Sequence, residues 1–296
     1  MLKTNEEKLA KFRLQGSVVP MYGFGWEVCH DGKPRMLPSV GGITLNFKVG
    51  DLANKYVSDH LEPGVSTTME PGESGKAGSR RNTGYNSFSC IGNEVSVLTG
   101  KAKGKKGVVT GHHGGCEHVI IDFDNSTLEK LNYDDKFLIT AFGCGLQIDE
   151  FPSISFFSLS PVLLSKMNVK KAGTNLLVPV VTTVPAVAMG SGLGSSDSYK
   201  GDYDIQTSDK ETCEKYGLHK LRIGDIVAVQ DHDSGFGWSY KKGAISIGVV
   251  IHGDSHIAGH GPGCQTIMTS KEGLIIPKID PNANIGRYLK IGRFRK

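Results

Sequence analysis

The chain has 296 residues, of which 38% are hydrophobic and 22% are charged, so it can bury a core and is not a disordered protein. This length suits one large domain or two of ordinary size. The formal net charge of +4 permits an anionic partner without demanding one. No apolar run approaches the ~20 residues that a membrane-spanning helix needs, so we expect no membrane association.

The predicted helices are few and short. The first is an amphipathic N-terminal helix, with a capping box formed by Thr4 and Glu7. The other two begin at Ser160 and Ser208, which are suitable N-cap residues, and the last of them ends at Gly217.

Strand signals are more numerous than helix signals. Short β-branched runs alternate with glycine turns, and the 39 glycines are spread along the chain. Residues 16–93 show little periodicity and are predicted to form loops with irregular strands. The pattern is typical of a mainly β protein built from barrels or sandwiches. The predicted strands cover residues 94–98, 118–123, 136–142, 176–184, 225–231, 244–251, 264–270 and 273–277.

An internal similarity predicts two related domains. "LNYDDKFLI" starts at Leu131 and "LRIGDIVAV" starts at Leu221, and both place a turn and an aspartate before an apolar strand. The alternative is coincidence, because a turn before a strand is common. We predict an N-terminal β-barrel domain at residues 1–150 and a C-terminal β-barrel domain at residues 151–296.

The cysteines favour a reducing compartment. None of the six forms a CxxC pair, and the N-terminal segment is too charged for a signal peptide. We therefore expect reduced thiols and a cytoplasmic protein. The cysteines are Cys29, Cys90, Cys116, Cys144, Cys213 and Cys264.

The clearest local pattern is "EVSVLTGKAKGKKGVVTG" at residues 94–111, which we call the lysine hairpin. It resembles the KOW motif, a strand–loop–strand element of SH3-like barrels, and that resemblance implies contact with RNA or protein through the basic turn at 100–107. Its four lysines could neutralise phosphates, but no aromatic platform for single strands lies nearby. The alternative is a solvated hairpin, so a nucleic acid partner is possible but not favoured.

The segment "GHHGGCEH" follows this hairpin directly. His112 and His113 are adjacent and point in different directions if the chain is extended, so at most one of them joins a site. The alternative is a polar hairpin tip.

A glycine–serine loop at residues 189–195 could cradle an anion or substrate through its backbone amides. It lacks the pattern of a phosphate-binding P-loop, so nucleotide hydrolysis is not supported. The alternative is a flexible surface loop. The candidate anion-binding residues are Gly190, Ser191, Gly192 and Ser195.

Two pairs of aspartates follow the same spacing. Asp202 and Asp204, and Asp231 and Asp233, lie two residues apart, which puts both carboxylates of a pair on one face of an extended chain. Such pairs can converge on one cation, although aspartates at turns are also common for reasons of solubility.

The strongest candidate site is "GAISIGVVIHGDSHIAGHGPG" at residues 243–263. His252, Asp254 and His256 alternate, so they share a face in an extended chain, and His260 can return to it through the glycine turn. Imidazole and carboxylate together suit zinc, manganese or iron(II), and imidazole also serves proton transfer. We predict these four as catalytic groups. The candidate metal ligands are His252, Asp254, His256, Asp202, Asp204, Asp231 and Asp233. The alternative is a set of structural histidines in glycine turns.

Several motifs together resemble one prokaryotic family of unknown function that is associated with RIFT-related β-barrel domains. They are "EPGVS", "CIGNEVSVLTGKAKGKKGVVTGHHGGCEHVIIDF", "AMGSGLGSS", "GDYDIQT", "RIGDIVAV" and "AGHGPG". The resemblance spans nearly the whole chain and implies two RIFT/SH3-like β-barrel domains with a few short helices. It implies no activity. More locally, "GAISIGVVIHGDSH" is similar to a strand-and-turn segment of the acetamidase/formamidase enzymes.

Two functions therefore stand as hypotheses. The first is a small-molecule enzyme, a metal-assisted hydrolase or lyase with a His/Asp pocket in the C-terminal domain. The second is a non-catalytic RNA- or protein-binding protein that uses the basic turn at 100–107. A homo-oligomer is expected in either case. A concave cluster of polar groups would favour the enzyme, and a convex basic face would favour the binding protein.

Overall fold

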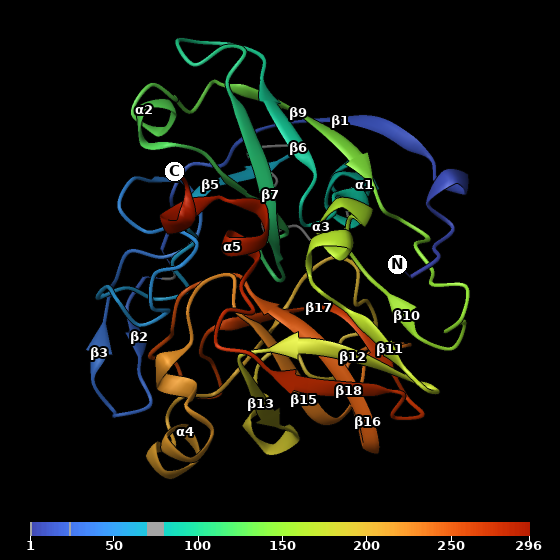
Figure 1. Cartoon of the computed structure of the whole chain (residues 1–296). Coiled ribbons are helices and arrows are strands. Elements are labelled where there is room, and N and C mark those ends of the chain that lie inside the picture. The colour runs from blue at the N-terminus through green and yellow to red at the C-terminus, as the bar shows by residue number, and fades with distance from the viewer. Residues whose placement is uncertain (1, 24, 70–79) are drawn as a thin grey trace.

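The computed structural model describes residues 2–23, 25–69 and 80–296, and it is mainly β (Figure 1). A closed six-stranded barrel forms from strands of the first half of the chain. The strands run in the order β1-β9-β6-β7-β8-β5, and pairing of β5 with β1 closes the barrel. These strands are β1 (Lys11–Val18), β5 (Gly64–Thr68), β6 (Glu94–Val97), β7 (Lys106–His113), β8 (His118–Asp122) and β9 (Lys136–Phe142).

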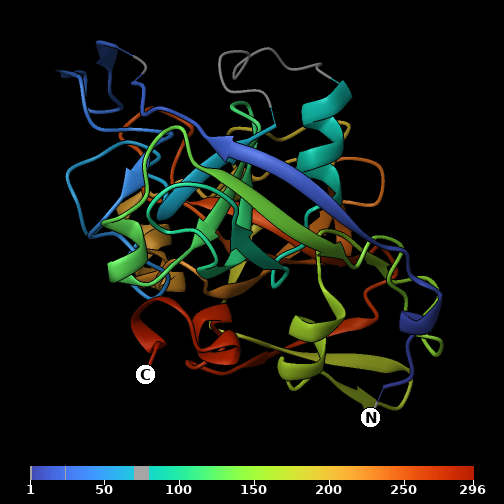
Figure 2. The ribbon, with the colours of Figure 1, turned by 90° about the horizontal axis from the view of Figure 1, so that it is seen from above.

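Two short elements extend the barrel domain. β4 (Ile43–Thr44) adds to β5, and β2 (Glu27–Val28) pairs with β3 (Pro34–Arg35) in a separate hairpin. The helix α1 (Arg80–Phe88) lies beside β1, as Figure 2 shows from above. Its Tyr85 is buried against Gly16, where an added Cβ would lie 2.4 Å from the tyrosine ring. Glycine therefore permits this close contact between helix and strand.

The second half of the chain forms two further sheets. β10, β17, β16, β15 and β13 lie in that order in the larger sheet, and β14 pairs with β17. The smaller sheet has the order β11-β12-β18. The bounds are β10 (Ser155–Phe156), β11 (Lys170–Ala172), β12 (Asn175–Val180), β13 (Thr182–Pro185), β14 (Tyr203–Asp204), β15 (Ile226–Asp233), β16 (Ser239–Val250), β17 (Gly263–Ser270) and β18 (Ile275–Ile279).

The prediction of a mainly β, two-domain chain with short helices is confirmed, whereas a RIFT relationship and a KOW relationship stay predictions. β10 already pairs with β17, so the chain has entered the second set of sheets by Ser155. The boundary near residue 150 also stays a prediction. The remaining helices are α2 (Asn125–Leu128), α3 (Pro161–Lys166), α4 (Lys210–Tyr216) and α5 (Ile285–Leu289), with 3-10 turns at Glu6–Lys8, Ala186–Ala188, Leu218–Lys220 and Gly292–Phe294.

The hydrophobic core is continuous between the two halves. One cluster fills the barrel and includes Val95, Phe137 and Ile139. A larger cluster joins the second-half sheets to first-half residues such as Phe47 and Ile120. The halves therefore share buried apolar surface, and groups at their boundary are held in fixed positions.

The predicted helices differ in outcome. α3 begins where expected, because the Ser160 hydroxyl accepts a hydrogen bond from the Leu163 amide at 3.1 Å. α4 also forms and ends at Gly217, but its N-cap is Asp209 rather than Ser208. The predicted N-terminal helix is wrong: a single 3-10 turn precedes β1, which pairs with β9 from Lys11 onwards. This long-range pairing outweighs a local capping signal.

The prediction of loops over residues 16–93 missed two strands of the barrel. β1 extends into that region, and β5 lies within it with all five residues buried. β5 lacks the polar–apolar alternation of a half-exposed strand, because both of its faces are covered.

The repeated aspartate pattern forms the same turn twice. The Asp135 carboxylate accepts from the Asn132 amide at 2.8 Å, and the Asp135 amide donates to the Asn132 carbonyl at 3.0 Å. Asp225 and Arg222 make the same pair of bonds at 2.8 and 3.0 Å. Each turn leads into a strand, β9 or β15. The local structure is therefore shared, while equivalence of the two strands within related domains stays a prediction.

Within the described residues, no helix combines the length and apolar character needed to cross a membrane. All six cysteines are free thiols.

Candidate metal centre

A cavity of about 740 Å³ lies where loops of the two halves meet. Our prediction placed the pocket in the C-terminal domain alone, and the lining corrects it. The loop before β5 runs against the loop after β16, since the Gly253 amide donates to the Leu61 carbonyl at 2.9 Å and the His60 amide to the Asp254 carbonyl at 3.1 Å. The lining residues used below are His60, His113, Cys116, Glu117, Ser191, Gly192, Ser195, Lys200, Asp202, Asp204 and His260.

His60, Asp204 and His260 form one group of potential metal ligands, which we call the open triad. The Nε2 atom of His60 lies 2.9 Å from Nδ1 of His260 and 3.2 Å from Oδ2 of Asp204. The third edge, from His260 Nδ1 to Asp204 Oδ2, is 2.9 Å. Ligands at right angles and ~2.1 Å from one ion would stand about 3.0 Å apart. The three atoms therefore have the spacing of three ligands on one face of a metal ion.

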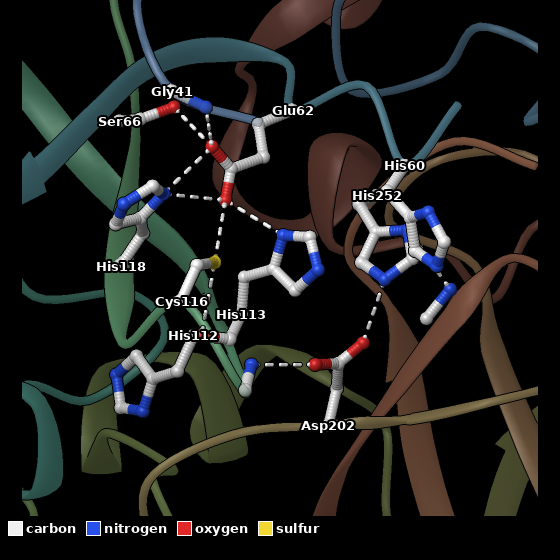
Figure 3. A network of polar contacts seen from close by, with 12 residues as sticks. Gly41, His60, Glu62, Ser66, His112, His113, Cys116, His118, Asp202 and His252 are labelled. Atoms are coloured by element: carbon white, nitrogen blue, oxygen red, sulfur yellow. Dashed lines mark hydrogen bonds and ion pairs between the residues drawn. The ribbon is translucent and has the colours of Figure 1, made fainter. Parts of the chain in front are cut away.

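His113, Asp202 and His252 form a second group, which we call the buried triad. Nε2 of His252 lies 2.9 Å from Oδ2 of Asp202, and neither atom makes a hydrogen bond within the described residues. Figure 3 shows the His113 ring turned toward His252. The two rings lie 4.1 Å apart between centroids. Buried polar atoms without hydrogen bonds are rare in proteins and are typical of places where an ion or water binds.

Three of the four triad histidines, His60, His113 and His252, are oriented by acceptors on the Nδ1 atom of the ring. Nδ1 of His113 lies 2.7 Å from Glu62, Nδ1 of His60 contacts the Asp59 carboxylate, and Nδ1 of His252 lies 2.8 Å from the Gly253 carbonyl. The Gly263 amide is 3.3 Å from the same His252 nitrogen, but the shorter contact to a carbonyl places the proton on Nδ1. Metal-binding histidines almost always have such an outer partner, which leaves Nε2 as the ligand.

Glu62 is the most extensively bonded of these outer groups. It is fully buried, and it accepts hydrogen bonds from the Gly41 amide at 2.6 Å and the Ser66 hydroxyl at 2.5 Å. Nδ1 of His118 lies 3.0 Å from both of its oxygens (Figure 3). The carboxylate thus has a fixed orientation, and it fixes the ring of His113 in turn.

The carboxylates and imidazoles of the site shift one another's pKa. Burial raises the pKa of Asp204, but His252, His260 and His60 outweigh burial and hold that pKa well below its usual range. Burial disfavours protonation of His252, but Asp202 and Asp204 outweigh it and raise the pKa of the imidazole well above its usual value. Asp204 is therefore ionised, and positive charge must accompany it, either as protons on imidazole or as a cation.

Four of the predicted site residues come together here. Asp202, Asp204, His252 and His260 belong to the two triads. Ser191, Gly192 and Ser195 line the cavity, whereas Gly190 is not among the lining residues and packs against Gly259, whose carbonyl oxygen would lie 2.1 Å from an added Cβ.

Three of the four amides predicted to form an anion cradle at the glycine–serine loop are already hydrogen-bonded, those of Gly190, Ser191 and Ser195. The amides of Gly190, Ser191 and Gly194 donate to the carbonyls of Asp204, Gly259 and Trp238 at 2.8, 2.7 and 2.9 Å. The Ser195 amide donates to Gly192 within the loop at 3.1 Å. Of the four predicted residues, only Gly192 has an amide with no backbone hydrogen bond within the described residues, and Ser191 and Ser195 line the cavity.

The other four predicted residues lie outside both triads. The Asp254 carboxylate accepts from the Thr207 hydroxyl at 2.7 Å, and the Asp231 carboxylate accepts from the Gly243 amide at 2.7 Å. Asp233 contacts Gly235 and Thr269 in the larger sheet. His256 contributes its backbone amide to the Asp59 carboxylate at 3.2 Å, while its ring is in neither triad.

The alternation argument failed because the segment is not extended. β16 ends at Val250, and residues 251–260 form an irregular loop. Their backbone follows hydrogen bonds to residues 53–61, so side chains two residues apart no longer share a face. His260 still enters the site, because its position depends on the turn rather than on a strand.

Sequence reasoning missed the contribution of the first domain. His60 and Glu62 belong to the run "DHLEP" at 59–63, within the region read as loops, and His60 has the uncommon left-handed φ of 54°. The concentration of acid and imidazole in that run was the available signal. His113 had been considered only as one of two alternatives with His112, and β7 directs His113 into the site while His112 contacts the Tyr199 carbonyl at 3.1 Å.

Comparisons with known proteins agree with this architecture. The profile described as "Domain of unknown function (DUF4438), N-terminal" matches residues 26–165, and the corresponding C-terminal profile matches residues 166–289. A solved structure, the crystal structure of TM1086, is 42% identical, covers 97% of this chain and 99% of its own, and superposes with a TM-score of 0.90. No curated protein matches the chain. The chain belongs to the DUF4438 family.

Proposed function

We propose that the protein is a metal-dependent hydrolase acting on a small polar molecule in the cavity between its two halves. The observation that carries this proposal is the spacing of the open triad, whose three edges of 2.9, 2.9 and 3.2 Å match ligands on one face of an ion. Two imidazoles and one carboxylate suit zinc, manganese or iron(II).

Such a facial arrangement leaves coordination positions open on the side of the cavity. A divalent ion held there supplies a Lewis acid and lowers the pKa of a bound water toward neutrality. His260 is 29% exposed, whereas Asp204 is nearly buried. A bound ion would therefore be held by Asp204 on its buried side and would face the cavity on its other side. Water and substrate could therefore both reach the ion.

The rest of the lining indicates how a substrate would be held. Lys200 is the single lysine or arginine among the described lining residues, and its Nζ lies 3.6 Å from Asp197. Ser191 and Ser195 offer hydroxyls. These groups would bind the polar or anionic part of a small substrate, while the ion polarises its carbonyl or phosphoryl group.

The test is the metal content of protein purified without a histidine tag. We expect at least one zinc, manganese or iron ion per chain by mass spectrometry, and loss of that ion in His260→Ala. His256→Ala is the matched control, because it removes a nearby imidazole that belongs to neither triad. If wild-type protein contains no such ion and binds none on titration, the proposal is wrong.

Hydrolysis should then be assayed with generic amide, ester and phosphoester substrates. Activity that disappears on chelation, returns with added metal and is absent in His260→Ala would identify the reaction class. Activity that survives complete removal of metal would contradict the proposed mechanism.

A further inference from the structure

We infer that the cavity binds two divalent ions rather than one, the second in the buried triad, with Asp204 as the bridging carboxylate. This inference rests on the proposed function and specifies its metal centre. The argument depends on the orientation of Asp204, on the buried triad and on the balance of charge.

Asp204 presents one oxygen to each group of ligands. Its Oδ2 faces His260 and His60 at 2.9 and 3.2 Å, which places it in the open triad. Its Oδ1 lies on the other side, 3.6 Å from Nε2 of His252 in the buried triad. A carboxylate with one oxygen in the open triad and the other facing the buried triad is suited to bridging two ions.

The buried triad is a separate set of ligands and not an extension of the first. Its three ligand atoms lie within 4.8 Å of one another, as do those of the open triad, and the two sets have no residue in common. His252 is completely buried, and its Nε2 faces Asp202 without a hydrogen bond. The other Asp202 oxygen accepts from the Gly114 amide at 2.8 Å, so the carboxylate is held in this orientation.

Close packing behind these two atoms maintains the arrangement. An added Cβ on Gly263 would lie 1.8 Å from Asp202 Oδ2 and 2.3 Å from His252 Nε2. The glycine thus allows β17 to support both ligands directly, and no larger residue could occupy that position.

The charge of the site is compatible with two ions. Four buried or nearly buried carboxylates, those of Asp59, Glu62, Asp202 and Asp204, contact the histidines of the site. Within the described residues, none of the four forms an ion pair with lysine or arginine. Uncompensated buried charge is costly. Two divalent ions would offset four ionised carboxylates with every imidazole neutral, and with fewer ions the remaining negative charge would be offset by protons on the imidazoles.

A bridged pair of ions would limit the reactions that the proposed hydrolase could catalyse. Two ions ~3.5–4 Å apart can hold the attacking water and the oxygen of the substrate at the same time. This arrangement suits hydrolysis of small phosphoryl or acyl compounds.

The experiment measures ion stoichiometry in the intact protein and in variants of each triad. Metal-free protein is titrated with Mn²⁺, bound ions per chain are counted after removal of free metal, and electron paramagnetic resonance reports spin coupling. His113→Ala and Asp202→Asn affect only the buried triad, and His260→Ala affects only the open triad. His256→Ala is the control, and circular dichroism confirms that each variant is folded. Asp202→Asn preserves size, so it stays informative if His113→Ala fails to fold.

We expect two coupled ions per chain in wild type and in His256→Ala, and a single uncoupled ion in each triad variant. One ion in wild type, or an unchanged ratio in a folded Asp202→Asn, would overturn the second site while leaving the proposed function in place. No bound ion in wild type would contradict both.

Discussion

The cavity and the lysine hairpin both contain polar segments that the sequence analysis identified, but the polar side chains are buried in the cavity and exposed in the hairpin. In the cavity, imidazoles and carboxylates from both halves are buried and face one another. In the hairpin, Lys101, Lys103 and Lys105 are exposed, and their ammonium groups make no hydrogen bond or ion pair within the described residues. Lys106 pairs with Glu94 at 2.6 Å on the surface.

The difference shows why composition alone is a poor guide to function. Exposed charges remain solvated and interact weakly, so the hairpin needs no partner. Buried charges must be compensated, and in the cavity either protons on the imidazoles or a bound cation can do so. The enzyme hypothesis therefore accounts for a buried polar cluster, whereas the contacts of the hairpin within the described residues do not specifically favour the binding hypothesis.

The largest effect is expected at the bridge between the triads. Asp204→Asn should weaken ion binding by more than about 100-fold, because loss of a direct ligand exceeds the ~10–100-fold typical of outer partners. Isothermal titration of metal-free protein would measure it. Ion binding within a few-fold of wild type would mean that the cavity cluster is a hydrogen-bonded network and not a metal centre.

A smaller effect on the ion is expected from Glu62→Gln. The variant keeps the shape of the side chain but weakens its hold on His113, so ion affinity should fall ~10–100-fold and stability by about 1–3 kcal/mol. Glu117→Gln is the control, since Glu117 lines the cavity outside both triads and should leave ion affinity little changed. Lost stability with unchanged affinity would limit Glu62 to a structural role.

A third prediction concerns His112, the buried neighbour of His113, which we expect to affect the pH dependence of stability but not ion binding. Burial lowers its pKa from 6.5 to about 4. Below about pH 6.5 His112 becomes protonated in the unfolded chain but stays neutral in the native state. The free energy of unfolding therefore decreases as pH falls toward 4, by up to about 3 kcal/mol.

His112→Gln should flatten part of this slope in denaturant unfolding measured between pH 4 and 7. His232, whose pKa burial also lowers to about 4, should supply a further part. Ion stoichiometry should not change in His112→Gln. An unaltered pH slope would show that His112 is already protonated or accessible in the native protein.

The smallest effect is expected in the hairpin. Replacing Lys103 and Lys105 with Gln should change stability by less than about 0.5 kcal/mol and leave ion binding unaltered. Chemical denaturation would measure the first and metal titration the second. Tight RNA binding by wild type at low salt, weakened by salt and by these substitutions, would instead revive the binding hypothesis.

The sequence determined most of the local structure. Short β-branched runs between glycine turns predicted several strands of each half, among them β6, β8, β9, β15, β16 and β17, but not β1 and β5. Ser160 predicted the start of α3, and the aspartate pattern predicted the turns at Asp135 and Asp225. It also predicted four residues of the site, Asp202, Asp204, His252 and His260. These signals succeed because they depend on neighbours within a few residues.

Only the tertiary structure decided how the site is assembled. His60 is 144 residues from Asp204 and 200 from His260 in the chain, and the three meet because the loop before β5 packs against the loop after β16. His256 is not among the residues that line the cavity, and β7 places His113, rather than His112, in that lining. In irregular loops the direction of a side chain follows from long-range backbone hydrogen bonds, and local sequence does not specify those bonds.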